Sequence, residues 1–561
     1  MENVRRYALY GALAVVSYLL LQAWNADYGQ TINTAPQQQS QMPSATVDNT
    51  PSPDVQNAAT GEDVPPIGQN NSTQPATTAS QSTANKLIHV RTDVLDLNID
   101  LNGGDVVYLG LPKYPQSLQT PDVPFVLLEN DATRQFIVKS GLLVGGQNEG
   151  RGLFSASKSD YTMTGDSLDV ILSYQQNNIS YDKIFHFRKG DYLFDVSYKV
   201  TNNTDSTWQG SFYGQINRDK SADPSASKGM SFSSVLAFAW TTPDTRYEKV
   251  KFSKIDDGVD NIKNQGGWVA FLQHYFVTAW VPGKQDTNTY YLTKTPGDKY
   301  RGGFAAPSVS IAPGGSQELT ASVYAGPKIQ QHLSKVAEHL ELSVDYSWLW
   351  WAAQPIFWLL TKIQSMVINW GWSIILLTIC IKGLFYPLTA SSYRSMAKMK
   401  KFAPKMQELR EQYGEDRQKM SQELMKLYQK EKINPLGGCL PMVVQMPVFM
   451  ALYWVLQEAV ELRQSPWIFW IHDLSIRDPY FILPILMSGS MFLQMQMTTQ
   501  ANMDPMQAKM MKMMPMVFGI MFLWFPSGLV LYWLVNNLIT ITQQWFINRQ
   551  IAKADNKKAA A

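Results

Sequence analysis

Hydrophobic positions are distributed unevenly along this chain of 561 residues. Residues 7–24 form an apolar run, residues 27–85 carry almost no large apolar side chains, and residues 86–326 alternate apolar with polar positions. Beyond them lie five apolar segments at 354–386, 438–460, 480–497, 511–526 and 529–548. Apolar runs of about 20 residues are typical of membrane-spanning helices. The pattern therefore predicts six transmembrane helices, five of them in one core, and a large domain outside the membrane.

The alternating region, residues 86–326, is predicted to be an all-β domain. Apolar residues recur at every second position from Leu95 to Leu101, before a turn at Gly103-Gly104, and again from Tyr192 to Val200. Period-two patterns with glycine turns are typical of antiparallel strands, and their number favours a large sandwich. Both cysteines, Cys380 and Cys439, lie outside this region, so the domain folds without disulfides.

A different periodicity follows the β-region. Residues 327–353 are predicted to form an amphipathic interfacial helix, because apolar residues step by three and four positions along it and lead to a tryptophan cluster. The residues concerned are Ile329, Leu333, Val336, Leu340, Trp348, Trp350 and Trp351.

The distribution of basic residues predicts the topology. Arg5 and Arg6 precede the first apolar run, and no small-x-small cleavage pattern follows it, which favours an uncleaved anchor at 1–26 over a cleaved signal peptide. Residues 27–85 lack the apolar side chains of a folded core and are predicted to be a disordered linker. We expect the amino terminus to be cytoplasmic and the β-domain to be periplasmic.

Lysine and arginine then mark the remaining loops. They are abundant in residues 387–437 and in the tail 549–561, and sparse in the loop 461–479. By the positive-inside rule the first two are cytoplasmic, together with the loop 498–510, and the third is periplasmic. Within 387–437, two helical patterns separated at Gly414 predict a helical hairpin. Its basic surface is either a solvated face that follows the topology rule or a docking arm for ribosomal RNA, a targeting factor or anionic lipid.

Lys382 lies within an apolar run that contains no acidic residue. A lone charge at the centre of a bilayer costs about 2.5–3.5 kcal/mol on insertion scales. Either the side chain reaches a nearby interface, because Pro387 follows five residues later, or it faces a hydrated cavity inside the membrane. In the second interpretation, Lys382 is available to bind a negatively charged group that enters the cavity.

Other polar residues occur within the apolar segments. Thr378 lies one helical turn before Lys382, Gln445 lies in the second core span, and Asn536 and Asn537 lie in the last. Polar side chains in membranes commonly join helices to one another, and with Lys382 these residues could also line one groove.

Catalytic motifs are absent from the sequence: there is no G-x-S-x-G, H-E-x-x-H or phosphate loop, and the six histidines are scattered. His472-Asp473 is interpreted as a loop hydrogen bond, and His186 and His274 as imidazoles satisfied within the β-domain. We expect no enzyme activity, no cofactor and no metal.

Four motifs resemble the YidC family of membrane protein insertases, in its Gram-negative form. They are Phe385-Tyr-Pro-Leu-Thr, Ser395-Met-Ala-Lys-Met, Asn434-Pro-Leu-Gly-Gly-Cys-Leu-Pro with Gln445-Met-Pro, and Leu523-Trp-Phe-Pro-Ser-Gly-Leu-Val-Leu-Tyr. The match is dense over residues 350–550. The resemblance implies a five-helix insertase core with a hydrophilic groove in the inner leaflet, and a periplasmic β-supersandwich followed by an interfacial helix.

The resemblance also implies roles for individual residues. The basic residue of the groove, usually arginine in the family, falls on Lys382, and its neighbours fall on Thr378, Gln445 and Trp533. The surface along which clients slide falls on Pro441, Met442, Met446, Pro447 and Pro515. The implied partners are nascent membrane proteins, the lipid bilayer and the Sec translocon, with the ribosome and a targeting factor at the basic hairpin and tail.

The sequence thus predicts a multi-pass protein of the bacterial inner membrane that inserts nascent membrane proteins and chaperones their folding, alone or with the Sec translocon. A small-molecule transporter is the alternative, but it would show two internal repeats, and none is visible in 354–548. A membrane-anchored carbohydrate enzyme would need carboxylates or histidines clustered at strand ends, which the sequence does not display.

Overall fold

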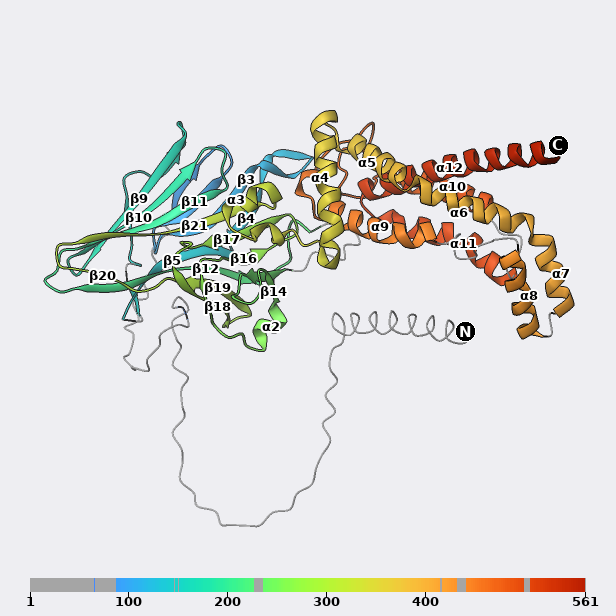
Figure 1. Cartoon of the computed structure of the whole chain (residues 1–561). Coiled ribbons are helices and arrows are strands. Elements are labelled where there is room, and N and C mark those ends of the chain that lie inside the picture. Colours follow the sequence, from blue (N-terminus) through green and yellow to red (C-terminus); the bar gives the residue numbers. More distant parts are fainter. Residues whose placement is uncertain are drawn as a thin grey trace, which may run out of the picture. The chain divides into compact units, whose positions relative to one another are not determined.

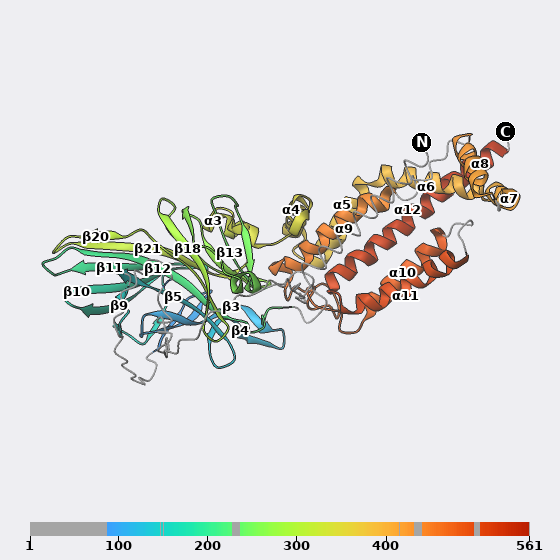
Figure 2. The same ribbon diagram turned by 90° about the horizontal axis from the view of Figure 1, so that it is seen from below.

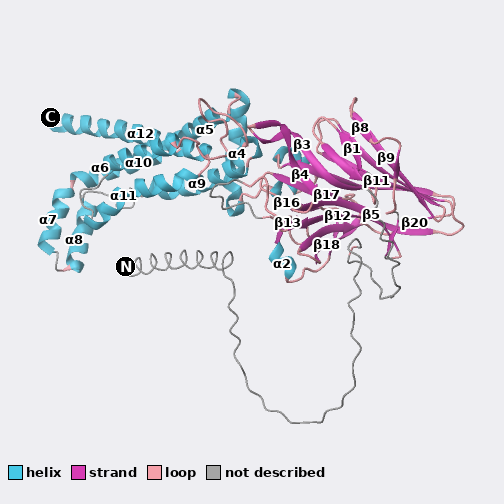
Figure 3. Cartoon of the chain, turned by 180° about the vertical axis from the view of Figure 1, so that it is seen from behind, coloured by secondary structure: helices cyan, strands magenta, loops and turns pink. Residues whose placement is uncertain are grey.

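The computed structural model describes residues 65, 87–145, 147–149, 151–226, 236–413, 416–430, 440–498 and 505–559. The predicted anchor at 1–26 and nearly all of the predicted linker at 27–85 lie outside these residues, so both stay predictions. The described chain consists of a β-region followed by helices (Figures 1 and 3).

The β-region contains two extended sheets, as the alternating pattern predicts. The 12-stranded sheet has the order β15 (Ile262–Gln265), β18 (Thr287–Thr295), β19 (Lys299–Ala305), β12 (Trp208–Asp219), β5 (Gln135–Val144), β4 (Thr120–Asn130), β3 (Asp105–Ser117), β2 (Asp96–Asp100), β1 (Leu87–Arg91) and β8 (Asp160–Thr162), with β20 (Val309–Ile311) on β12 and β6 (Gln147–Glu149) on β5. The 9-stranded sheet has the order β14 (Glu248–Lys251), β13 (Ala237–Trp240), β16 (Val269–Leu272), β17 (Phe276–Val281), β21 (Ser316–Pro327), β11 (Leu193–Asn202), β10 (Ile179–Arg188), β9 (Ser167–Gln176) and β7 (Ser155–Ala156). A short helix, α2 (Phe252–Asp256), follows β14. The prediction of an all-β domain is confirmed.

Strand β10 shows how the alternation builds the core. Its odd-numbered side chains, from Ile179 to Phe187, are buried, and its even-numbered ones are half-exposed. One of the buried positions holds Lys183, whose Nζ donates to the carbonyls of Gly103 (3.1 Å) and Gly104 (2.7 Å). Both glycines have positive φ, so the turn predicted at this pair is confirmed. A Cβ on Gly104 would lie 2.8 Å from Cδ of Lys183, so the turn and the lysine fit only with glycine there.

The predicted interfacial helix at 327–353 is wrong in its extent. Only α3 (Gln330–Val336) is helical at its start, and it ends at Ala337, which is extended. The short 3-10 helices η1 (Leu340–Ser343) and η2 (Ser347–Leu349) follow, and His339 before η1 is left-handed. Leu333 and Leu340 do face inward, but they are buried in the core cluster continuous with the sandwich. The apolar periodicity therefore reflects packing against the protein and not one continuous helix.

The predicted span 354–386 is also wrong as a single helix. Helix α4 (Trp350–Val367) ends at Ile368, which has a left-handed φ of 61°, and α5 (Trp370–Leu384) begins after Asn369. The Asn369 side chain accepts from the backbone N–H of Trp372 and so caps the new helix. The predicted segment is interrupted by polar residues just before this break, at Lys362, Gln364 and Ser365, and by Asn369 at the break itself.

The remaining helices are α6 (Tyr386–Lys401), α7 (Ala403–Tyr413), α8 (Arg417–Lys430), α9 (Leu440–Glu458), the 3-10 turn η4 (Val460–Leu462), α10 (Ile482–Thr498), α11 (Pro505–Met521), the 3-10 turn η5 (Phe522–Trp524) and α12 (Ser527–Ala559). Helices α9 and α10 lie close to the predicted segments 438–460 and 480–497, but the bounds predicted at 498–510, 511–526 and 529–548 are wrong, because α11 begins inside the predicted loop and α12 continues past residue 548. Helix α12 contacts α5, α6, α9 and α10, and α4 contacts α5 and α9 (Figure 2). Helix α12 also extends through most of the basic tail predicted at 549–561.

Judged by length and composition alone, no single helix among the described residues could cross a membrane. The pair formed by Trp370–Leu384 and Tyr386–Ala397, bent by 63°, meets the same test jointly. The number of membrane spans therefore stays a prediction.

Candidate functional site

Lys382 is the centre of a polar cluster between three helices. It lies in the last turn of α5 and is only 6% exposed. Its Nζ donates to Thr540 Oγ1 on α12 at 2.9 Å and to Gln445 Oε1 on α9 at 3.3 Å. Both acceptors are neutral, and the described part of the chain contains no ion pair to Lys382. The ammonium is thus directed toward neighbouring helices and does not extend to the end of its own helix.

The acceptors are themselves held by α12. Gln445 Nε2 donates to Asn536 Oδ1 at 2.7 Å, and Thr540 Oγ1 donates to the backbone carbonyl of Asn536 at 2.7 Å. Asn536 and Thr540 are four residues apart, so they lie on the same face of the helix. The cluster consequently leaves Lys382 as a positive charge whose neighbours cannot neutralise it. We call Lys382, Gln445, Asn536 and Thr540 the polar cluster.

The other residues predicted to line the groove lie beside this cluster. Thr378 is buried on α5, and its hydroxyl donates to the carbonyl of Ile374 at 2.6 Å, so it bonds within its own helix. Trp533 lies on the same face of α12 as Asn536 and packs edge-on against Phe449, with ring centroids 4.7 Å apart. The structure therefore brings Lys382 and Gln445 into direct contact and places Trp533 in an adjoining apolar layer.

Thr540 is the member of the cluster that sequence reasoning missed. A threonine in an apolar helix is unremarkable, and its hydroxyl commonly bonds to the preceding turn. The available signal was its spacing from Asn536, which places both residues toward the same neighbour. Spacing alone could not show that the neighbour is α5.

The predicted sliding surface is only partly exposed. Met446 on α9 is 54% exposed, Pro447 is half-buried and Pro515 on α11 is buried. Pro441 and Met442 lie within α9, and their side chains lie outside the described ones. The exposed apolar side chains nearest to the predicted positions are Val443 on α9 and Met513, Met514, Met516 and Val517 on α11.

The histidines considered for chemistry have ordinary partners. His186 bonds to Asp169 on the neighbouring strand, and His274 Nε2 lies 2.9 Å from the carbonyl of Gln457. Asp473 accepts from the N–H and hydroxyl of Ser475. His186 and Asp473 have partners close by, as expected. The expectation for His274 is wrong, because its partner Gln457 lies on α9 and its Nδ1 is buried with no hydrogen-bond partner among the described residues.

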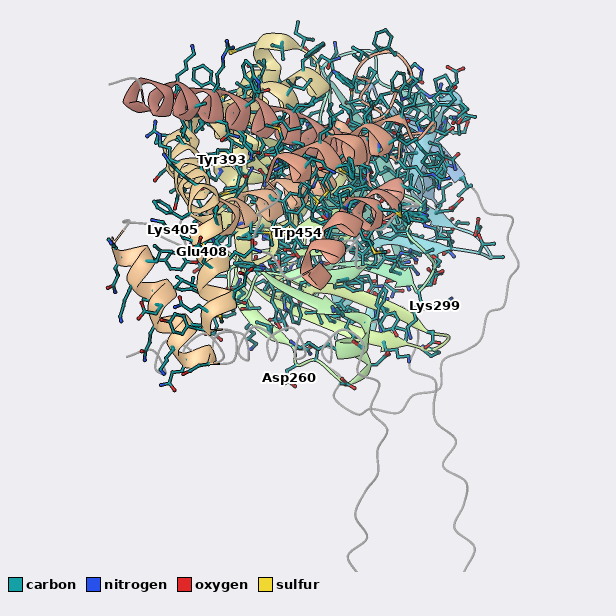
Figure 4. The ribbon with its side chains drawn as sticks, turned by 90° about the vertical axis from the view of Figure 1, so that its right-hand side faces the viewer. Asp260, Lys299, Tyr393, Lys405, Glu408 and Trp454 are labelled. Atoms are coloured by element: carbon teal, nitrogen blue, oxygen red, sulfur yellow. The ribbon has the colours of Figure 1, made fainter. Side chains whose placement is uncertain are left out.

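The basic hairpin consists of α7 and α8, which pack against each other. Met406 is buried between them, and the hydroxyl of Tyr428 donates to its sulfur. Lys405 and Glu408 lie on exposed positions of α7 (Figure 4). The break before α7 falls at Phe402, two residues before Pro404. The predicted pair of short helices is confirmed in α7 and α8, but the extent predicted for the hairpin, 387–437, is wrong at its start, where the chain forms the separate helix α6.

Comparison with known proteins gives consistent matches over the whole chain. The family model described as the YidC periplasmic domain matches residues 87–359, and the one described as the 60Kd inner membrane protein matches residues 362–555. A membrane protein insertase YidC of Stutzerimonas stutzeri is 50% identical over 554 residues, covering 98% of this chain and 99% of its own. That of Ectopseudomonas mendocina is 48% identical over 580 residues, with 98% and 99% covered. A solved structure described as an active YidC insertase is 18% identical, with a TM-score of 0.36, and covers 82% of this chain and 92% of its own; that TM-score is too low to add to the argument.

The sandwich, the apolar helices and the matched regions define an inner-membrane protein with a periplasmic domain. The chain belongs to the YidC family of membrane protein insertases. The resemblance carried by the four sequence motifs is thereby confirmed. The relatives are named for the insertion of membrane proteins, which is not an enzymatic reaction, and this agrees with the expectation of no enzyme activity.

Proposed function

We propose that this chain inserts nascent inner-membrane proteins through a hydrated groove at the polar cluster, on the cytoplasmic side of the membrane. The observation that carries the proposal is the Lys382 ammonium, which is buried among helices and, among the described residues, bonded to neutral oxygens alone. We further propose six spans with a cytoplasmic amino terminus, in which α9 ends on the periplasmic side. This topology supports a groove that opens toward the cytoplasm and the lipid.

The charge gives the groove its selectivity. Two opposite charges 4 Å apart attract by about 1 kcal/mol in water and by about 4 kcal/mol near a protein surface. An acidic, short extracytoplasmic tail of a client would gain this attraction as it enters. Thr540, Gln445 and Asn536 offer polar groups that lower the cost of moving the polar backbone of the client part-way across the membrane.

Apolar contacts complete the proposed path. The client helix would leave the polar cluster past Met446 and Val443 on α9, which are 54% and 63% exposed, and past the exposed methionines of α11. Methionine side chains are flexible and adapt to clients of different shape. Burial of about 20 apolar residues in hydrocarbon then drives release into the bilayer. The same surface supports a chaperone role in folding.

Partners beyond the client are proposed on the same basis. The exposed lysines of α7 and α8, among them Lys419 and Lys426, support binding of the ribosome or a targeting factor from the cytoplasmic side. The periplasmic sandwich would serve contacts with the Sec translocon.

The proposal is tested with Lys382→Glu in cells depleted of the native protein. Insertion of a small client with an acidic tail, and of the same client with that tail neutralised, is followed by protease protection. We expect insertion of the acidic client to fall about 5–30-fold, the factor that corresponds to 1–2 kcal/mol, while the neutral client changes little. Lys382→Arg keeps the charge and should retain activity.

Lys362→Glu is the matched control, because Lys362 is exposed on α4. This control should insert both clients normally. Equal loss of both clients with Lys382→Glu would contradict electrostatic attraction. Normal insertion in depleted cells that receive no variant would contradict the proposed function as a whole.

A further inference from the structure

The hairpin formed by β3 and β4 ends in an exposed tip, residues 116–123. The tip carries Leu118 and Val123, which are 41% and 43% exposed, although both are large and apolar. Its sequence from Tyr114 to Pro121 contains no charged residue. The strands close at Ser117 and Thr120, whose hydroxyls lie 2.8 Å apart. The tip carries one charged side chain, Asp122, beside Val123, and Leu118 lies in the uncharged part. Other large apolar side chains of the domain, such as Ile171, are also exposed, so exposure alone does not set the tip apart.

The base of this tip is attached to the chain segment that follows α9. Arg463 Nη2 donates to the carbonyl of Pro115 at 2.8 Å, and Gln464 Nε2 donates to the same oxygen at 2.9 Å. The guanidinium of Arg463 also lies over the rings of Phe125 and Phe276, at 5.5 and 5.8 Å from their centroids. The hairpin is therefore fixed at the level of residues 463–464.

The attachment point, residues 463–464, lies close to the end of α9. The helix ends at Glu458, and Arg463 follows after the single turn η4. The same loop presents Phe469, Ile476 and Tyr480, which are 79%, 46% and 66% exposed. Aromatic side chains are enriched where a membrane meets water. If α9 ends at the periplasmic face, this loop and the hairpin base lie in the outer interfacial layer.

The hairpin is long enough for its tip to cross that layer. Leu118 is three residues beyond Pro115, so in extended chain it extends up to about 10 Å from the attachment point. The headgroup region is roughly 5–7 Å thick on each side of the hydrocarbon core. By contrast, two apolar side chains are too small a surface for a stable protein partner, which needs about 800 Å² on each side.

We infer that the tip of the β3–β4 hairpin inserts Leu118 into the headgroup layer of the outer leaflet and so anchors the periplasmic domain at the membrane surface. The inference rests on the proposed topology, in which α9 ends on the periplasmic side. Arg463 and Gln464 set the height of the tip, and Leu118 and Val123 contact lipid.

The test uses the full chain with Cys380→Ser and Cys439→Ser, reconstituted in vesicles of phosphatidylethanolamine and phosphatidylglycerol. Leu118→Cys and, separately, Thr120→Cys carry an environment-sensitive fluorophore, and quenching by lipids spin-labelled at the headgroup is measured. We expect quenching at both sites to be at least about twofold stronger than at Ile171→Cys, because Ile171 is 49% exposed on β9 within the same domain. Arg463→Ala should reduce the quenching at position 118.

Phe469→Cys distinguishes failure of the inference from failure of the topology. Quenching at 469 without quenching at 118 and 120 would overturn the inference and leave the topology intact. Absence of quenching at all of these sites would contradict the proposed position of the end of α9, and with it the inference.

Discussion

Lys382 is the residue on which the proposed function depends. Burying a lone ammonium at membrane depth costs about 2.5–3.5 kcal/mol on insertion scales, and hydrogen bonds to charged groups return about 1.5–3 kcal/mol each. The bonds to Thr540 and Gln445 are therefore sufficient to hold the charge in place. They offset the cost without neutralising the charge, which stays available to a carboxylate.

Removing the hydrogen-bond acceptor Thr540 should show how much its bond to Lys382 offsets the cost of burying the ammonium. Thr540→Val keeps the shape of the side chain but leaves the ammonium with one fewer partner, so we expect a loss of about 1–3 kcal/mol in stability. Thermal unfolding of the full chain in detergent measures it. Thr542→Val is the control, because Thr542 is exposed and its hydroxyl donates to the carbonyl of Leu538 in its own helix. Equal effects of the two substitutions would contradict the assigned bond.

Lys183 gives a second prediction for a single residue, in the sandwich. Burial lowers the pKa of Lys183 to about 7, against an opposing effect of Asp105 and with a further lowering by Arg151. Between pH 7 and the ordinary lysine pKa of 10.5, Lys183 is protonated in the unfolded chain and mostly neutral in the folded chain. The free energy of unfolding therefore rises with pH across this window, by on the order of 2 kcal/mol from pH 7 to 9. Below pH 7 both states are protonated, and the burial cost is fully present.

Hydrogen exchange of the β10 amides in the full chain measures this effect. After correction for intrinsic exchange rates, protection should increase from pH 7 to 9 in the native sequence, and this increase should disappear in Lys183→Met. Lys199→Met, at an exposed position of the neighbouring strand β11, should keep it. A rise that persists in Lys183→Met would contradict the role of this lysine.

At the scale of secondary-structure elements, the hydrophobic periodicity predicted those elements that bury the same face along their whole length. The two strands located from the sequence, β2 and β11, and the helices α9 and α10 fall close to their predicted bounds, because each strand buries one regular face and each helix is apolar over most of its length. Periodicity failed at 327–353 and 354–386, where the breaks depend on the backbone at His339, Ile368 and Asn369. Lys382 was found because a cation in an apolar run is conspicuous. Thr540 and Lys183 were missed because their importance depends on which elements face them.

The helical hairpin of α7 and α8 carries its own prediction. Lys419→Glu with Lys426→Glu reverses two exposed charges, which are also balanced locally by Asp416 and Glu423. If the hairpin docks on ribosomal RNA, co-sedimentation of the full chain with ribosomes should weaken severalfold and depend less steeply on salt. The double change Lys294→Glu with Lys299→Glu in the β-domain is the control. Unchanged co-sedimentation would contradict docking on ribosomal RNA. The basic residues of α7 and α8 would then only reflect the positive-inside rule.

For the whole molecule, the account joins a periplasmic sandwich to a helical core in which α12 contacts four other helices. Insertion in this account needs no chemical step. It needs a place where water, one positive charge and lipid meet, so that polar and apolar parts of a client move together. Every part of this mechanism requires that the polar cluster be reached by water from the cytoplasm.

Thiol accessibility at position 382 tests that requirement most directly. Lys382→Cys, with both native cysteines replaced by serine, is compared with a chain that keeps only Cys380, which is exposed on the outer surface of α5 just two residues away. A charged, membrane-impermeant maleimide is applied from the cytoplasmic side of inverted membrane vesicles. The account predicts rapid labelling at 382 and slow labelling at 380, because it places the exposed side of α5 that carries Cys380 against lipid. Slow labelling at 382, equal to that at 380, would contradict it.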